Sequence, residues 1–353
     1  YLENAKKNTV NGIEVNDNDG NLLKILSFYN YSSAKNSFKE TPILFYKTIF
    51  DLRLFSKELQ KESLEFLVNQ GIYKPSLLIK EYNSFLTEDE LVFYLENKSK
   101  KNNDPKLRAA TFQLITNSVA TTDRAKGLMK LWELAEEKNI LKAISLITKN
   151  SIMSLSPDST LNWFNLPAAK SLILSNEIEA AKKWIFFGTS DIRERASVDI
   201  KFCRLLMLMY LYDTNISDYR GQTLDINYYL RILKNDLNIN EKDFLKFILT
   251  LNALGLEIPS EMWKMFFSNE TFSPNYFKFF RNHTSSYFML DNAVIDNNLA
   301  EAALLSIKLL QDERSLYKEM YSFYKGIKGL SMIGLESYAR SFAMEENFDF
   351  LAK

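Results

Sequence analysis

The stretch that most constrains the fold spans residues 166–188, LPAAKSLILSNEIEAAKKWIFFG, which predicts two short helices joined by a tight turn. Pro167 suits the first turn of a helix, because that position needs no backbone N–H. The connector contains Asn176, and asparagine tolerates unusual backbone angles. The second helix runs over 177–187 and ends at Gly188, a residue that commonly follows a helix. The sequence therefore predicts an antiparallel helical hairpin.

The second helix of this hairpin separates small and apolar residues from charged ones. Its apolar face holds Ala180, Ala181, Trp184 and Phe187, and its polar face holds Glu177, Glu179, Lys182 and Lys183. Such segregation is typical of a helix that packs on one side and is solvated on the other. We therefore expect the four charges to be structural and solvated, with no role in chemistry.

The remaining sequence extends the helical pattern. Gly (10) and Pro (7) are scarce among 353 residues, which disfavours a many-stranded protein with frequent turns. Hydrophobic residues make up 46%, enough for a sizeable core, and we find no strand with a period of two. The fold class is predicted to be all-α. Helices are expected at 21–31, 42–55, 57–70, 75–85, 87–96, 107–119, 123–137, 140–153, 192–212, 224–236, 240–254, 259–269, 274–281, 285–296, 298–311, 314–332 and 335–350.

A turn residue followed by a buried-type alanine recurs along the chain. The pairs are Asn139 with Ala143, Asn176 with Ala180, Asn298 with Ala302, and Gly334 with Ala339. Alanine at this place lets two helices approach closely. The pattern resembles the second helix of tetratricopeptide-type repeats, although their first-helix Trp-Leu-Gly-Tyr pattern is absent. The resemblance implies an irregular α-solenoid of stacked antiparallel hairpins; an irregular helical bundle without a true repeat is the alternative.

The expected organisation has three parts. Residues 1–20 are polar, carry Asn-Gly and Asp-Gly turn signals, and form a loosely ordered lead-in. Residues 21–100 form N-terminal helical hairpins. The hydrophilic loop 97–104 then separates them from a continuous α-solenoid-like array over 104–353.

Charge and cysteine content limit the classes of function. The 44 basic and 44 acidic residues balance, which argues against nucleic-acid binding. No apolar run is long enough for a membrane span. The single Cys203 cannot form an internal disulfide, and we expect it to pack in the core. Composition suggests a bacterial source with an AT-rich genome, and a location in the cytoplasm, or in the periplasm if a leader was removed before Tyr1.

Three short segments are similar to motifs of two known families. Gly326 and Gly329 have the Gly-x-x-Gly spacing of a KH-domain loop, but their flanks predict helix, so a loosened helix or close helix contact is the preferred interpretation. Glu336-Ser337 resembles the catalytic pair of lytic transglycosylases, and Gly127-Leu128-Met129 resembles a second segment of that family. Their order here is reversed, so Glu336 is expected to begin a helix instead. The analogy extends to the α-superhelical scaffold that some of those enzymes carry.

No catalytic, cofactor-binding or metal-binding residue is predicted. His283 is the only histidine and is expected in a solvated turn. A carboxylate-only site stays open, because paired acids have no fixed sequence spacing. The candidates Glu133, Glu136 and Glu137 fit a solvated helix face, and Lys98, Lys100 and Lys101 fit a soluble loop.

The segment 272–288, FSPNYFKFFRNHTSSYF, is the candidate partner-binding surface, since aromatic residues with interspersed cations are typical of interface hot spots. Packing of these rings between adjacent helices is the alternative. The candidate residues are Tyr276, Phe277, Lys278, Phe280, Arg281 and Tyr287.

These observations predict a non-catalytic scaffold that binds a protein or peptide, without a cofactor. A cell-envelope enzyme acting on wall glycan, or the helical platform of one, is the first alternative. A helical repeat that binds nucleic acid is the second.

Overall fold

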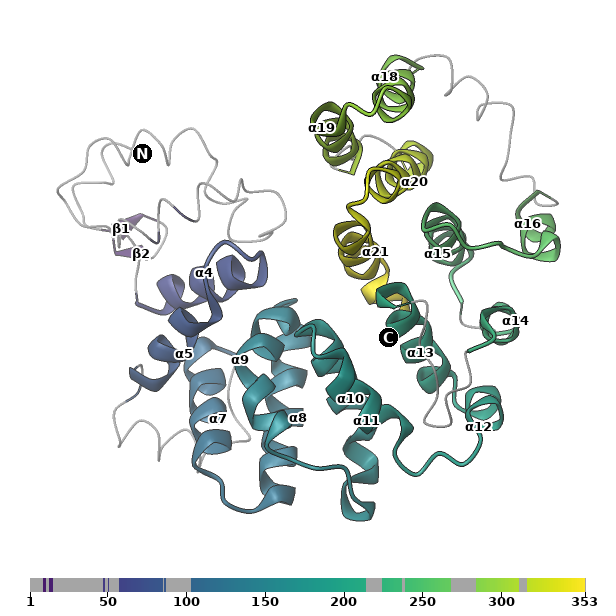
Figure 1. Ribbon diagram of the computed structural model, residues 1–353. Coiled ribbons are helices and arrows are strands. Elements are labelled where there is room, and N and C mark those ends of the chain that lie inside the picture. Colours follow the sequence, from purple (N-terminus) through teal and green to yellow (C-terminus); the bar gives the residue numbers. More distant parts are fainter. Residues whose placement is uncertain are drawn as a thin grey trace. The chain divides into compact units, whose positions relative to one another are not determined.

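A computed structural model describes the ranges 9–10, 13–14, 57–84, 103–213, 224–236, 239–267, 284–310 and 316–352, with the single residues 47, 50 and 86 (Figure 1). The chain divides into two compact units, Tyr1–Phe187 and Gly188–Lys353. Within the described ranges there are 16 α-helices, so the predicted all-α class is confirmed.

Unit 1 contains seven of these α-helices, one 3-10 helix and a small strand pair. The pair, absent from our prediction, joins Thr9 to Glu14 and Val10 to Ile13 in an antiparallel ladder. Helices α7 to α11 pack on their neighbours in chain order, and α4 and α5 pack on α7 and α9. The elements are β1 (Thr9–Val10), β2 (Ile13–Glu14), α4 (Lys57–Asn69), α5 (Pro75–Ser84), α7 (Pro105–Asn117), α8 (Thr121–Glu137), α9 (Leu141–Met153), η2 (Ser159–Phe164), α10 (Asn165–Leu174) and α11 (Ile178–Phe186).

Unit 2 contains the remaining described helices. Among them α18, α19, α20 and α21 pack in chain order, and α20 and α21 also contact α15. The elements are α12 (Ile192–Val198), α13 (Ile200–Tyr212), α14 (Ile226–Lys234), α15 (Glu241–Ala253), α16 (Ser260–Phe267), α18 (Thr284–Ile295), α19 (Leu299–Leu310), α20 (Leu316–Met332) and α21 (Glu336–Leu351).

The same turn closes six of the hairpins. In each, one residue has a positive φ, and the N–H of the next residue donates to a carbonyl five positions earlier, as Ile140 does to Ala135 and Glu177 to Leu172. This is the Schellman ending of a helix. It explains why Asn and Gly stand there, since both tolerate the left-handed region. In these six turns the residues with positive φ are Gly71, Asn139, Asn176, Gly255, Asn297 and Gly334; Gly188 also has a positive φ.

The turns correct the register of two predicted pairs. In one pair, Asn297 and not Asn298 has the positive φ. In the other, the fully buried alanine of the helix after Asn176 is Ala181. Ala180 is only half-buried, because α11 begins at Ile178 and turns that side chain towards solvent. The other three alanines of the predicted pairs, Ala143, Ala302 and Ala339, are fully buried as expected.

The predicted single helix over 192–212 is wrong, because the helix is interrupted at Asp199. Its carboxylate accepts hydrogen bonds from the N–H groups of Lys201 and Phe202, at 3.1 and 3.2 Å, and so caps α13. An aspartate favours such a cap over a helix interior. The second segment, α13, is buried on nearly every side, as its apolar sequence predicted.

Helix α21 packs against α13, from which it is distant in sequence, and against α15. The Arg340 guanidinium donates to the carbonyl of Leu211 at the end of α13, at 3.2 Å. On α15, the Asn347 amide donates to the Thr250 hydroxyl at 3.2 Å. A one-dimensional array contacts only its sequence neighbours, so these bonds give unit 2 a closure that such an array lacks.

Close approach of α19 and α20 depends on the two glycines of the Gly-x-x-Gly segment. Both lie inside α20. A Cβ at Gly329 would stand 2.4 Å from the Ser306 hydroxyl, and one at Gly326 would stand 2.7 Å from Leu310 Cγ. Of the two preferred interpretations, close helix contact is therefore confirmed.

Candidate functional site

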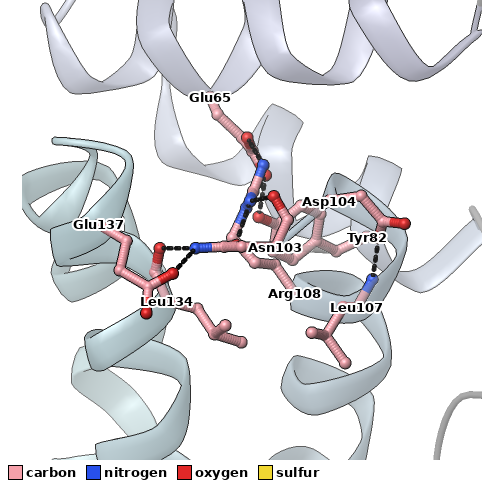
Figure 2. Close-up of polar contacts among 8 residues, drawn as sticks. All are labelled: Glu65, Tyr82, Asn103, Asp104, Leu107, Arg108, Leu134 and Glu137. Carbon is pink, nitrogen blue, oxygen red and sulfur yellow. Dashed lines mark hydrogen bonds and ion pairs between the residues drawn. The ribbon is translucent and has the colours of Figure 1, made fainter. Parts of the chain in front are cut away.

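A buried cluster of polar side chains joins the helices at the start of unit 1 (Figure 2). Glu65 on α4 receives two hydrogen bonds from the Arg108 guanidinium on α7, Nε to Oε1 at 2.9 Å and Nη2 to Oε2 at 2.6 Å. The Tyr82 hydroxyl on α5 donates to the same Oε1. The side chains of Arg108 and Glu65 are 1% and 2% exposed, so the ion pair is shielded from water.

Asn103 extends the cluster to α8. Its side-chain oxygen accepts from Arg108 Nη1 at 2.6 Å. Its amide nitrogen donates to the carbonyl of Leu134 and to Glu137 Oε2, both at 2.7 Å. The adjacent Asp104 caps α7 by accepting from the Leu107 N–H at 2.8 Å (Figure 2). One connected set of contacts therefore links α4, α5, α7 and α8.

Burial and charge shift the pKa values in this cluster. Burial alone would lower the pKa of Arg108, but the carboxylate of Glu65 outweighs it and raises that pKa. Burial, followed by the charge of Glu65, raises the pKa of Tyr82 well above its usual value. Burial also raises the pKa of Glu62, one turn before Glu65 on α4; Arg108 opposes this shift and Glu65 adds to it.

Shifted pKa values are common in active sites, but buried structural ion pairs produce them too. Here the Glu65 oxygens and the donors of Arg108 bind side chains and backbone of the chain itself, and both residues are almost fully covered. A substrate would have to break these bonds to reach either group. The cluster therefore holds helices together.

The predicted partner-binding surface lies mostly outside the described residues. This applies to Tyr276, Phe277, Lys278, Phe280 and Arg281, whose role stays a prediction. Tyr287 lies within α18 and is 6% exposed. Its hydroxyl is 2.9 Å from that of Ser322 on α20, and its ring meets Tyr321 edge-on at 5.1 Å. For Tyr287 these contacts favour the alternative, packing between helices.

The other carboxylates examined in the sequence hold structural contacts. Glu336 begins α21 and pairs with Arg340 one turn on, at 2.6 Å. Glu133, Glu136 and Glu137 are exposed on α8. Glu136 pairs with Lys170 at 2.6 Å. His283 and the three lysines at 98, 100 and 101 lie outside the described residues.

Cys203 is fully buried in α13, as predicted, and burial raises the pKa of its thiol to about 12. A thiol of this kind is unreactive at neutral pH. Within the described ranges, no group of three or more His, Cys, Asp or Glu side chains could hold a metal ion. In the same ranges, no helix combines the length and the apolar character that a membrane span requires.

Exposed apolar side chains concentrate on α18 and α19. Leu304 is 70% exposed, Ile295 78% and Phe288 63%. These residues lie opposite the core that α18 and α19 form with α20 around Leu290 and Ala302. We call this set the α18–α19 face. It consists of Phe288, Met289, Ile295, Leu299, Leu304 and Ile307.

Neither feature was predicted from the sequence. A signal existed for the cluster, since Glu65 and Arg108 each stand among apolar residues on the face that a helical period would bury. For the α18–α19 face, the signal was the surplus of apolar residues in 299–310, LAEAALLSIKLL. A helix that packs on the core with one side needs apolar residues on that side only.

No protein-family model, curated protein or solved structure matches this chain. The functional inference therefore rests on the geometry of the chain itself.

Proposed function

We propose that this protein is a non-catalytic scaffold that binds another polypeptide, and that the α18–α19 face is its contact surface. The observation that carries the proposal is the concentration of large exposed apolar residues on that one hairpin. Exposed apolar side chains that gather on one part of a protein surface commonly mark an interface.

The degenerate helical-repeat interpretation supports this proposal. The residues with positive φ at Asn139 and Asn176 lie 37 residues apart, and so do those at Asn297 and Gly334. Among the described residues, five ion pairs join positions 30 to 34 apart, which fits successive hairpins stacked in register. They are Glu136–Lys170, Arg193–Asp225, Arg204–Asp236, Arg231–Glu261 and Asp291–Lys325.

The described contacts also account for Glu65, Arg108 and Glu336 without a reaction. The buried Glu65–Arg108 pair is fully engaged, and Glu336 is paired at a helix start. A scaffold requires only a stable framework and an accessible surface, and both are consistent with this arrangement.

Site-specific photo-crosslinking in the native cell tests the proposal. A photoreactive amino acid is placed at Leu304 in the full chain, with Val198 as the matched control. Val198 is 85% exposed at the end of α12, outside the α18–α19 face. We expect a defined protein adduct from position 304 and none from 198. Equal or absent labelling at both positions would contradict the proposal.

A further inference from the structure

The outer side of α19 carries an apolar stripe. Ala300, Leu304 and Ile307 recur at the spacing of one helix face and are exposed. The opposite side, with Ala302, Ser306 and Leu309, is buried against the rest of unit 2. Figure 1 shows α19 beside both α18 and α20, and both helices pack against it.

Two opposite charges border the stripe on one edge. Glu301 and Lys308 are seven residues apart, two helical turns, so they lie on the same edge of the helix. The midpoint between them falls between Leu304 and Leu305, at the centre of the stripe. From the N-terminus of α19, this edge therefore presents Glu301, then Leu304, then Lys308. In the opposite direction the order of charges is reversed.

This order is complementary to itself under a two-fold rotation. If a second α19 lies antiparallel across the stripe, the rotation brings each Glu301 opposite Lys308 of the partner subunit, and the contact occurs twice. Leu304 then meets Leu304 of the partner subunit at the axis. A symmetric dimer needs such a self-complementary surface. The antiparallel arrangement also places opposite ends of the two helix dipoles together.

We infer that the occupant of the stripe is a second copy of this chain, paired through antiparallel α19 helices. This inference rests on the proposed function and specifies its partner. A parallel two-fold pair would put the charged edges of the two helices on opposite sides of the interface, so neither Glu301–Lys308 contact could form. Binding of an unrelated apolar partner would not require Glu301 and Lys308 to lie at equal distances on either side of the centre of the stripe.

Sedimentation of the purified full chain over a concentration series tests the inference. We expect a monomer–dimer equilibrium for the wild type. L304E should abolish the dimer, because it places two carboxylates at the axis. E301K and K308E should each weaken dimerisation roughly tenfold, since each replaces two attractive contacts by two repulsive ones. The double variant E301K/K308E should restore it, and V198E should leave it unchanged.

The rescue separates pairing from local structure. Glu301 also accepts a hydrogen bond from the Asn298 amide at 2.7 Å, so E301K alone could disturb the start of α19. Reversing Lys308 would not repair that disturbance, and K308E serves as a second single variant at an exposed position. Circular dichroism confirms that each variant is folded.

A wild type that stays monomeric at the highest concentration overturns the inference, and so does a dimer that L304E leaves intact or that the double charge reversal fails to restore. A photo-crosslink from position 304 to a different protein would overturn the dimer while supporting the proposed function.

Discussion

Replacing Arg108 by Met leaves the Glu65 carboxylate buried with only the Tyr82 hydroxyl as a side-chain partner among the contacts of Figure 2. An unpaired buried charge of this kind costs about 3–5 kcal/mol of the free energy of unfolding. Glu65→Leu should cost a similar amount, because it strands the guanidinium. The double variant E65L/R108M removes both charges, and an apolar pair at such a site is often neutral or stabilising. It still leaves the Tyr82 hydroxyl and the Asn103 oxygen without a partner, at about 1–3 kcal/mol each when buried.

Each single variant also creates one of these unpartnered groups, the Asn103 oxygen in R108M and the Tyr82 hydroxyl in E65L. The double variant therefore lacks only the unpaired charge, and it is expected to be more stable than either single variant, with a coupling energy of at least ~2 kcal/mol. Urea unfolding of the full chain, followed by tryptophan fluorescence, measures this. Three tryptophans lie in unit 1 and one, Trp263, in unit 2, so a W263F background confines the signal to unit 1. The surface pair Lys130–Glu133, 59% and 56% exposed, is the matched control; K130M/E133L should show coupling below about 0.5 kcal/mol. Single variants that lose less than about 1 kcal/mol, or a double variant whose loss equals the sum of the two, would refute the role of the buried pair.

Three further predictions concern other parts of the framework. Burial raises the pKa of Glu62 above 4.5, so folding favours its protonated form. The wild type should therefore lose stability relative to E62Q as the pH rises through that raised pKa. Urea unfolding over a pH series measures this, and parallel pH profiles for the two proteins would contradict it. Gly329→Ala should cost about 1–3 kcal/mol, because its Cβ would overlap the Ser306 hydroxyl, and S306A should recover part of the loss in a thermal melt. Ala181→Trp should destabilise unit 1 by about 1–3 kcal/mol and Ala180→Trp by less, since only Ala181 is fully buried; equal effects in denaturant titrations would contradict the corrected register.

Local features of the fold could be predicted from the sequence because they depend on neighbouring residues. Asn139 determines where α8 ends and α9 begins, because its left-handed backbone conformation favours asparagine or glycine. The cap at Asp104 and the helix start at Pro105 follow from the same local chemistry. Asp199 shows the limit, since the apolar run after it predicted a continuous helix and its capping bonds outweighed that pattern.

Features that join distant segments could not be predicted. Glu65 and Arg108 are 43 residues apart, and the spacing of charges in the sequence does not predict that two helices will bring them together. The packing of α21 on α13 is of the same kind. For the candidate surface, composition pointed to aromatic residues at 272–288, whereas in the described ranges the largest group of exposed apolar residues lies on α18 and α19 and shares only Phe288 with that segment. Exposure depends on which side of a helix the rest of the unit covers, and that is a tertiary property.

The pairing of α13 with α21 has a consequence for how the chain is made. Helix α13 is apolar on nearly all sides, and the surface that covers part of it belongs to residues 336–351. During synthesis more than a hundred residues separate the emergence of the two helices, a matter of seconds at the usual rate of about 5–20 residues per second. For that interval the apolar surface of α13 has no native cover from α21. The apolar side of α13 that α21 covers in the folded unit therefore stays exposed during that interval.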